Sequence, residues 1–137
     1  MKVKICGVRT REIVDTAVDA GADYIGLVFF PKSPRYVEPD AARPLAELAS
    51  GRIETVAVLV DPDDALVDEI LATVRPGLLQ LHGSETPERV AAIKARSGLR
   101  VSTRAGTSGS PDTATMYSGT SRLCACCARG ATKAATR

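Results

Sequence analysis

The sequence predicts an α/β fold in which short buried strands alternate with amphipathic helices. Apolar runs of strand length begin near residues 3, 24, 55, 78 and 99, and helix-period patterns fill the intervals between them. Strands joined by crossover helices run parallel, so the array continues either as a doubly wound sheet or as a barrel. No strand is followed by the glycine pattern of a dinucleotide site or a P-loop, which favours a barrel.

The first strand is expected over residues 3–6, an apolar run that contains one lysine and ends in Cys6. Gly7 follows at once, as it does where a strand turns into a tight loop. Thr10 is a suitable N-cap for the next helix, and Gly21 supplies its stop. The apolar face of this helix is predicted to consist of Ile13, Val14, Ala17 and Val18.

The second strand is expected over residues 24–30, where YIGLVFF is apolar on both faces, as in a parallel sheet covered by helices. Pro31 and Pro34 then stiffen a polar loop. Because this loop carries Lys32 and Arg35, it is suited to binding an anion.

The third unit begins with a helix predicted from Asp40 to Ala49, in which Pro44 falls within the first turn. A buried strand follows over residues 55–60, and Asp61 and Pro62 end it. The next helix has an apolar face at the expected spacing, formed by Leu66, Val67, Ile70, Leu71 and Val74.

The fourth strand is expected over residues 78–81, with His82 and Gly83 at its end as Cys6 and Gly7 are at the end of the first. Thr86 followed by Pro87 predicts a capped helix start, and Gly98 its end. A fifth strand is expected to begin over residues 99–102.

Residues 103–137 depart from this pattern because they contain no Ile, Val or Phe. Their only large apolar side chains are Met116, Tyr117 and Leu123, too few to offset the entropy of ordering. We therefore expect residues 1–102 to form a partial barrel and residues 103–137 an irregular tail. A shifted reading frame of a high-GC gene would yield such a composition, and a deletion or a partial sequence is the rival hypothesis.

The charge pattern argues against nucleic acid as a partner. Residues 1–102 carry about two more acidic than basic side chains, and residues 103–137 about four more basic ones, without a basic stripe interleaved with aromatics. No apolar run reaches the roughly 18 residues that span a bilayer, and no signal peptide is expected, so the cytoplasm is the expected location. Cys6, Cys124, Cys126 and Cys127 lack the spacing of a disulfide framework or a zinc site, and we expect reduced thiols and no metal.

Four motifs resemble those of the phosphoribosylanthranilate isomerase family. They are KICGVRT at 4–10, GADYIGLVFFPKSPRYV at 21–37, VAVLVD at 56–61 and LLQLHG at 78–83. The resemblance covers about residues 1–100, and the SPRYV loop is its most specific part. It implies a (βα)8 TIM-barrel type of fold, truncated here to about the first four to five βα units.

The resemblance also implies an activity that needs neither cofactor nor metal. The family's enzymes convert a phosphosugar, N-(5-phosphoribosyl)anthranilate, to 1-(2-carboxyphenylamino)-1-deoxyribulose 5-phosphate in tryptophan biosynthesis. In this Amadori rearrangement an acid protonates the ribose ring oxygen to open it to a Schiff base. A base then takes the proton from the adjacent carbon.

The resemblance assigns roles to four residues of this sequence. Cys6 matches the general base, and Arg35 matches the position that meets the anthranilate carboxylate, for which a guanidinium offers two parallel donors. Gln80 and His82 match positions that line the pocket. Taken singly, each has a plainer interpretation: Cys6 as a small core residue, Arg35 as a solvated loop charge and His82 as a strand-end hydrogen-bonding group.

The family's general acid and its phosphate-binding loops have no counterpart in this sequence. A complete barrel needs about 200 residues, and the resemblance places the acid on strand six and the phosphate loops after strands seven and eight. We therefore predict little isomerase activity. The alternatives are a non-enzymatic half-barrel that binds a partner or itself through an open sheet edge, and another phosphosugar barrel enzyme.

Overall fold

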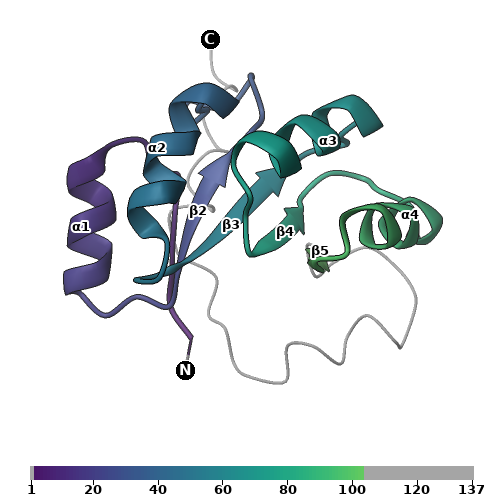
Figure 1. Cartoon of the computed structure of the whole chain (residues 1–137). Helices are drawn as coiled ribbons and strands as arrows, with labels where there is room; N and C mark the ends of the chain where they lie inside the picture. The colour runs from purple at the N-terminus through teal and green to yellow at the C-terminus, as the bar shows by residue number, and fades with distance from the viewer. Residues whose placement is uncertain (1, 104–137) are drawn as a thin grey trace, which may run out of the picture.

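The structure, a computed structural model, describes residues 2–103, which form five strands alternating with four helices (Figure 1). The predicted alternation is confirmed. The predicted tail and the reading-frame hypothesis lie outside the described residues, except Thr103, which pairs with Leu81. In chain order the elements are β1 (Lys4–Cys6), α1 (Arg11–Asp19), β2 (Tyr24–Val28), α2 (Pro39–Ala49), β3 (Glu54–Leu59), α3 (Asp64–Thr73), β4 (Leu78–Leu81), α4 (Pro87–Ser97) and β5 (Arg100–Thr103).

The strands form one parallel sheet in the order β1-β2-β3-β4-β5. Each strand pairs with the next in the chain, so the described sheet contains no reversal of strand order. A doubly wound sheet requires such a reversal, whereas an arc of a barrel does not. The predicted barrel type is confirmed over these units.

The helices follow one another in the same order as the strands, from α1 on the left to α4 on the right in Figure 1. Consecutive helices contact each other. The strand side chains that face the helices belong to the larger apolar cluster of the described residues, which buries the strand residues Ile25, Leu27, Ala57, Leu59, Leu79 and Leu81. We call this side of the sheet the outer face.

The opposite side, which we call the inner face, carries a smaller apolar cluster. Side chains alternate along a strand, so this face receives the neighbours of the outer-face residues. Its buried members are Val28, Val56, Val58 and Leu78, with Cys6, Tyr24 and Phe30 packed against them.

A hydrogen bond across the inner face shows that the sheet is curved. Lys4 Nζ on β1 donates to Gln80 Oε1 on β4, although β1 and β4 are separated by three strand spacings, about 14 Å in a flat sheet. Two side chains that rise from a flat sheet would not meet over this distance. The inner face is therefore concave, as in an arc of a barrel.

The start and end of α4 follow from its sequence. Thr86 Oγ1 accepts a hydrogen bond from Arg89 N at 3.3 Å, and Pro87 occupies the first helical position. Gly98 ends the helix with φ of +64°, a conformation that side chains other than glycine adopt at a cost. These predictions are confirmed.

Two helix predictions are wrong. The α2 helix begins at Pro39 with Glu38 as its N-cap, so Pro44 lies in the helix interior, beyond the first turn. Pro39 suits the first helical position because its φ is fixed, which explains the earlier start. On α1, Val14 and Ala17 are buried, but Ile13 is 40% exposed because, within residues 2–103, α1 packs against one neighbouring helix, α2.

Two predicted strands also end later in the sequence than the observed ones. The β2 strand ends at Val28 rather than at residue 30, and β3 spans Glu54–Leu59 rather than residues 55–60. Phe29 remains buried although it lies outside the strand. Apolar character therefore continues past the point where ladder pairing stops.

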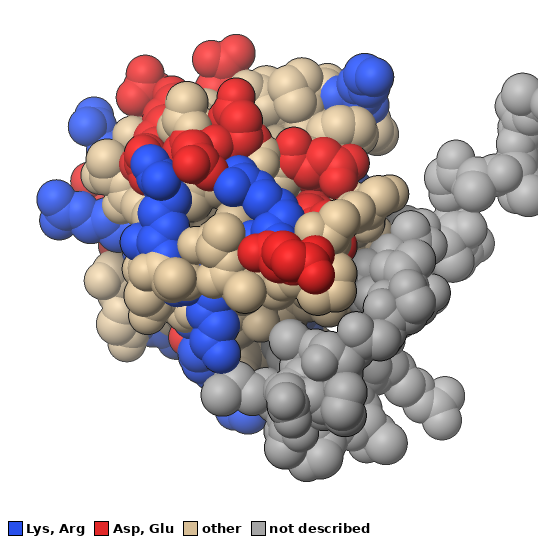
Figure 2. Space-filling model, turned by 90° about the vertical axis from the view of Figure 1, so that its right-hand side faces the viewer, with Lys and Arg blue, Asp and Glu red and all other residues tan. Residues whose placement is uncertain are grey.

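The surface in Figure 2 carries basic and acidic side chains next to one another, without a broad patch of either sign on the face in view. Within residues 2–103, no helix combines the length and apolar character needed to cross a bilayer.

Candidate active site

Cys6 is the last residue of β1 and lies on the inner face, packed against its apolar cluster. Its partner in the sheet register is Gly26 of β2. A Cβ atom placed on Gly26 would lie 3.1 Å from Cys6 Sγ, so the missing side chain leaves room for the thiol. Cys6 is half-buried. The structure thus places the predicted base at the C-terminal edge of the strand, the edge that carries the active site in TIM barrels.

Arg35 lies directly over Gly7, the residue after Cys6. A Cβ atom on Gly7 would be 2.4 Å from Arg35 Cδ, and Gly7 has φ of +85°, so both space and backbone favour glycine here. The loop that carries Arg35 returns to β2, where Val37 N donates to Val28 O at 3.0 Å. The fold therefore brings the aliphatic part of the Arg35 side chain against Gly7, the residue after Cys6, although 29 positions separate Cys6 from Arg35.

Gln80 lies on the inner face of β4 and accepts the hydrogen bond from Lys4. In the sequence, Lys4 is a polar interruption of an apolar strand. Its spacing of two residues from Cys6 was the signal that both side chains share one face. The structure adds Lys4 to the candidate site.

His82 directly follows β4, and its backbone N donates to Leu59 O at 2.8 Å. It therefore lies at the same edge of the parallel sheet as Cys6. The imidazole is on a half-buried residue beside the loop that follows β3. Of the four predicted residues, Cys6 and Arg35 meet around Gly7, whereas Gln80 and His82 belong to the other end of the arc.

The structure brings two further acidic side chains, Asp61 and Glu85, near His82. Glu85 Oε1 accepts from Asp61 N at 2.9 Å, and Asp61 Oδ1 accepts from Ser84 N at 2.8 Å. These bonds join the loop after β3 to the loop after β4. No local pattern indicates them, because their partners are more than 20 residues apart in the chain.

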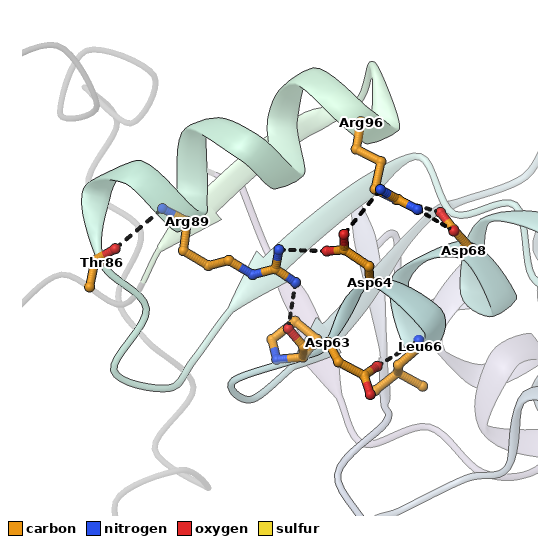
Figure 3. A network of polar contacts seen from close by, with 8 residues as sticks. Asp63, Asp64, Leu66, Asp68, Thr86, Arg89 and Arg96 are labelled. Carbon is orange, nitrogen blue, oxygen red and sulfur yellow. Dashed lines mark hydrogen bonds and ion pairs between the residues drawn. The ribbon is translucent and has the colours of Figure 1, made fainter.

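An ion-pair network behind these loops joins α3 to α4 (Figure 3). Asp64 lies between two arginines, with Arg89 Nη1 at 2.6 Å and Arg96 Nη1 at 3.1 Å. Arg96 also binds Asp68, and this hydrogen bond lowers the pKa of the Asp68 carboxyl below its ordinary value and raises that of Arg96. The network fixes the two helices behind the candidate site rather than contributing to its chemistry.

No general acid is apparent on the inner face near Cys6 among residues 2–103. The inner-face carboxylate of β3, Glu54, is at the N-terminal end of its strand, on the edge opposite to that of Cys6. It binds Arg100, and this hydrogen bond raises the pKa of Arg100. Over the same residues, no cluster of three or more His, Cys, Asp or Glu side chains is arranged to hold a metal ion.

A cleft on the helix side, between α2 and α3, is lined by charged residues that include Asp40, Arg43 and Arg75. It does not include any of the four predicted site residues. The site edge itself is open over the described arc, because strands of a barrel enclose a pocket only when they face others across it.

Known proteins with similar sequences include phosphoribosylanthranilate isomerases. The family model for N-(5'-phosphoribosyl)anthranilate (PRA) isomerase matches residues 3–123. The N-(5'-phosphoribosyl)anthranilate isomerase of Brucella canis is 56% identical over 101 residues, which are 74% of this chain and 46% of that protein. The chain thus spans about half the length of the curated relatives it matches. The family match extends 20 residues beyond the described part.

Solved structures give the same result. A phosphoribosylanthranilate isomerase from Thermotoga maritima is 35% identical with a TM-score of 0.71, over 82% of this chain and 56% of that one. A phosphoribosyl anthranilate isomerase in complex with reduced 1-(o-carboxyphenylamino)-1-deoxyribulose 5-phosphate is 33% identical with a TM-score of 0.72. That match covers 80% of this chain and 55% of the other.

Proposed function

The chain belongs to the N-(5'-phosphoribosyl)anthranilate isomerase family, and from this premise we propose that it carries the base-bearing half of an isomerase site. The proposed substrate is N-(5-phosphoribosyl)anthranilate and the product 1-(2-carboxyphenylamino)-1-deoxyribulose 5-phosphate, within tryptophan biosynthesis. A cytoplasmic location is part of the proposal.

The observation that carries the proposal is the contact of Arg35 with Gly7, directly beside Cys6. A guanidinium here can pair with the anthranilate carboxylate through two parallel hydrogen bonds. This pairing neutralises a negative charge that would otherwise disfavour a thiolate. The Cys6 thiolate can then take the proton from the ribose carbon next to the Schiff base, leaving an enol that becomes the ketone of the product.

Gln80 and His82 are proposed to line the same pocket from β4. Lys4 holds the amide oxygen of Gln80, which directs the amide nitrogen, a donor, toward the space above the sheet. Turnover by this chain is proposed to be weak. Residues 2–103 supply a base and a carboxylate-binding cation, but the carboxylates after β3 and β4 are occupied with backbone N–H groups.

Binding and turnover of the purified chain test this proposal separately. Calorimetric titration with the reduced product analogue is expected to show binding that Arg35→Met weakens at least about 10-fold, the loss of a charge-assisted pair. Cys6→Ser is expected to leave binding within about twofold while abolishing residual turnover. Unchanged affinity in Arg35→Met, or equal turnover in Cys6→Ser, would contradict the assigned roles.

A second candidate function is a half-barrel that associates through its open edges. Within the described sheet, β1 and β5 each pair on one side only, and Val3 and Ile13 beside β1 are 42% and 40% exposed. Unpaired parallel edges favour association. Sedimentation equilibrium would show a concentration-dependent mass that Ile13→Lys reduces, whereas a monomer at all concentrations would exclude this function.

A further inference from the structure

The loops that follow β3 and β4 are held together by two carboxylates that accept backbone N–H groups. Glu85 accepts from Asp61 N at 2.9 Å and from Gly83 N at 3.0 Å. In the opposite direction, Asp61 Oδ1 accepts from Ser84 N at 2.8 Å. Each loop therefore supplies a carboxylate to the other, and Glu85 also binds the backbone of its own loop.

The geometry at this junction requires particular residues. Asp61 has φ of +44°, a conformation that Asp and Asn tolerate better than most side chains. A Cβ atom on Gly83 would lie 2.5 Å from Asp61 Oδ1, so no larger residue fits there without a shift. These two constraints come together where the loops touch, and the carboxylate bonds hold the strained backbone in place.

The α4 helix fixes the β3 loop from behind. Arg89 Nη2 donates to Pro62 O at 2.7 Å, and Arg89 Nη1 donates to Asp64 at 2.6 Å (Figure 3). The residue after Asp61 is therefore anchored independently of Glu85. As a result, the N–H group of Asp61, which donates to Glu85, is held in a fixed position.

His82 lies between two of these anchors. Its own N–H is bound to Leu59 O at 2.8 Å, and the N–H of the next residue, Gly83, is bound to Glu85. The backbone on both sides of the imidazole is thus fixed, on one side by the sheet and on the other by a carboxylate. We propose that Glu85, with Asp61, is a positioning residue that fixes the direction of the His82 side chain at the candidate site. This inference rests on the proposed function in one respect: the proposed function supplies the substrate that His82 would contact.

The sequence offers a direct readout because it contains one histidine. The free, full-length chain therefore gives one imidazole Cε1–H signal by NMR. Glu85→Gln keeps the size of the side chain but offers one acceptor oxygen instead of two, and it is expected to shift and broaden this signal. Glu85→Ala removes both oxygens and is expected to broaden the signal further or split it. Glu88→Gln, the same change of charge on a side chain outside this junction, is the matched control and should leave the signal unchanged.

Amide hydrogen exchange separates the two carboxylates. Glu85→Gln is expected to speed exchange at Asp61 and Gly83 more than at Ser84. Asp61→Asn, which tolerates the same backbone conformation, is expected to speed exchange at Ser84 most. A role in overall stability alone would speed exchange throughout β3 and β4 and leave the His82 signal of the folded protein in place.

A His82 signal in Glu85→Gln that matches the unsubstituted chain would overturn the inference, as would faster exchange spread evenly over the sheet. Both measurements are made without substrate. Failure of the reduced product analogue to bind would therefore contradict the proposed function and leave this inference standing. Normal binding of the analogue together with an unaltered His82 signal in the variants would contradict this inference and leave the proposed function standing.

Discussion

The two faces of the sheet are built from the same strands but differ in composition. The outer face contributes only aliphatic side chains to a cluster that the helices cover. The inner face combines a small cluster of Val and Leu with the thiol of Cys6 and two polar pairs, Lys4 with Gln80 and Glu54 with Arg100. The difference indicates that the outer face supplies most of the stability, while the inner face holds groups that can bind and react.

The largest expected effect on stability is at Leu79, which is compared with Leu78. The two residues are neighbours on β4, and their side chains point to opposite faces of the sheet. Leu79 is fully buried in the outer cluster, and Leu78 is 4% exposed in the inner one. Leu79→Ala is expected to lower the free energy of unfolding by about 3 to 4 kcal/mol and Leu78→Ala by about 2 kcal/mol, because fewer neighbours surround its cavity. Urea unfolding measures both, and equal losses would break the comparison.

Gly7 provides a test beside Cys6, at the edge of the sheet that carries the candidate site. Both its positive φ and its contact with Arg35 favour glycine at this position. Gly7→Ala is expected to cost about 2 kcal/mol of unfolding free energy, from the positive φ and from contact with Arg35. Gly51→Ala is the control, because Gly51 has φ of +74° with no atom near the added Cβ, and about 1 kcal/mol is expected there. Similar losses in both variants would show that the Arg35 contact adds nothing.

Gly26 tests the space left for the thiol. Gly26→Ala places a methyl group 3.1 Å from Cys6 Sγ and is expected to cost about 1 kcal/mol and to slow the reaction of Cys6 with a disulfide reagent. The rate is measured with Cys124, Cys126 and Cys127 replaced by serine. In a Cys6→Ala background the same substitution should cost less, and an undiminished cost would argue against the contact.

The smallest effect is expected on the helix surface. Because the hydrogen bond from Arg96 lowers the pKa of Asp68 below 3.8, this carboxylate stabilises the fold above that value and the contribution is lost as pH falls through the folded pKa. Asp68→Asn should therefore lower the urea midpoint at neutral pH, and the difference from the unsubstituted chain should shrink as the pH falls below 3.8. Glu69→Gln, which removes a neighbouring carboxylate without an ion pair in the described part, should lack this pH dependence. A constant difference across pH would contradict the assignment.

Local sequence patterns were sufficient to predict the strands and helices and part of the candidate site. The β4 strand and the start of α4 follow from an apolar run and from Thr86 with Pro87, because turns and caps depend on neighbouring residues. The predicted place of Pro44 is wrong because Pro39, the earlier of two prolines that could begin the helix, occupies the first helical position. The bonds of Glu85 and Lys4 could not be predicted, since they depend on how distant strands and loops approach one another in space.

The bond between Lys4 and Gln80 also bears on the order of folding. Its partners are 76 positions apart, whereas each strand of the described sheet forms its ladder with the strand before it in the chain. Contacts that close such a long loop form late, after the intervening units have ordered. A substitution at either partner would therefore be felt mainly in the rate at which the arc opens and hardly in the rate at which it forms.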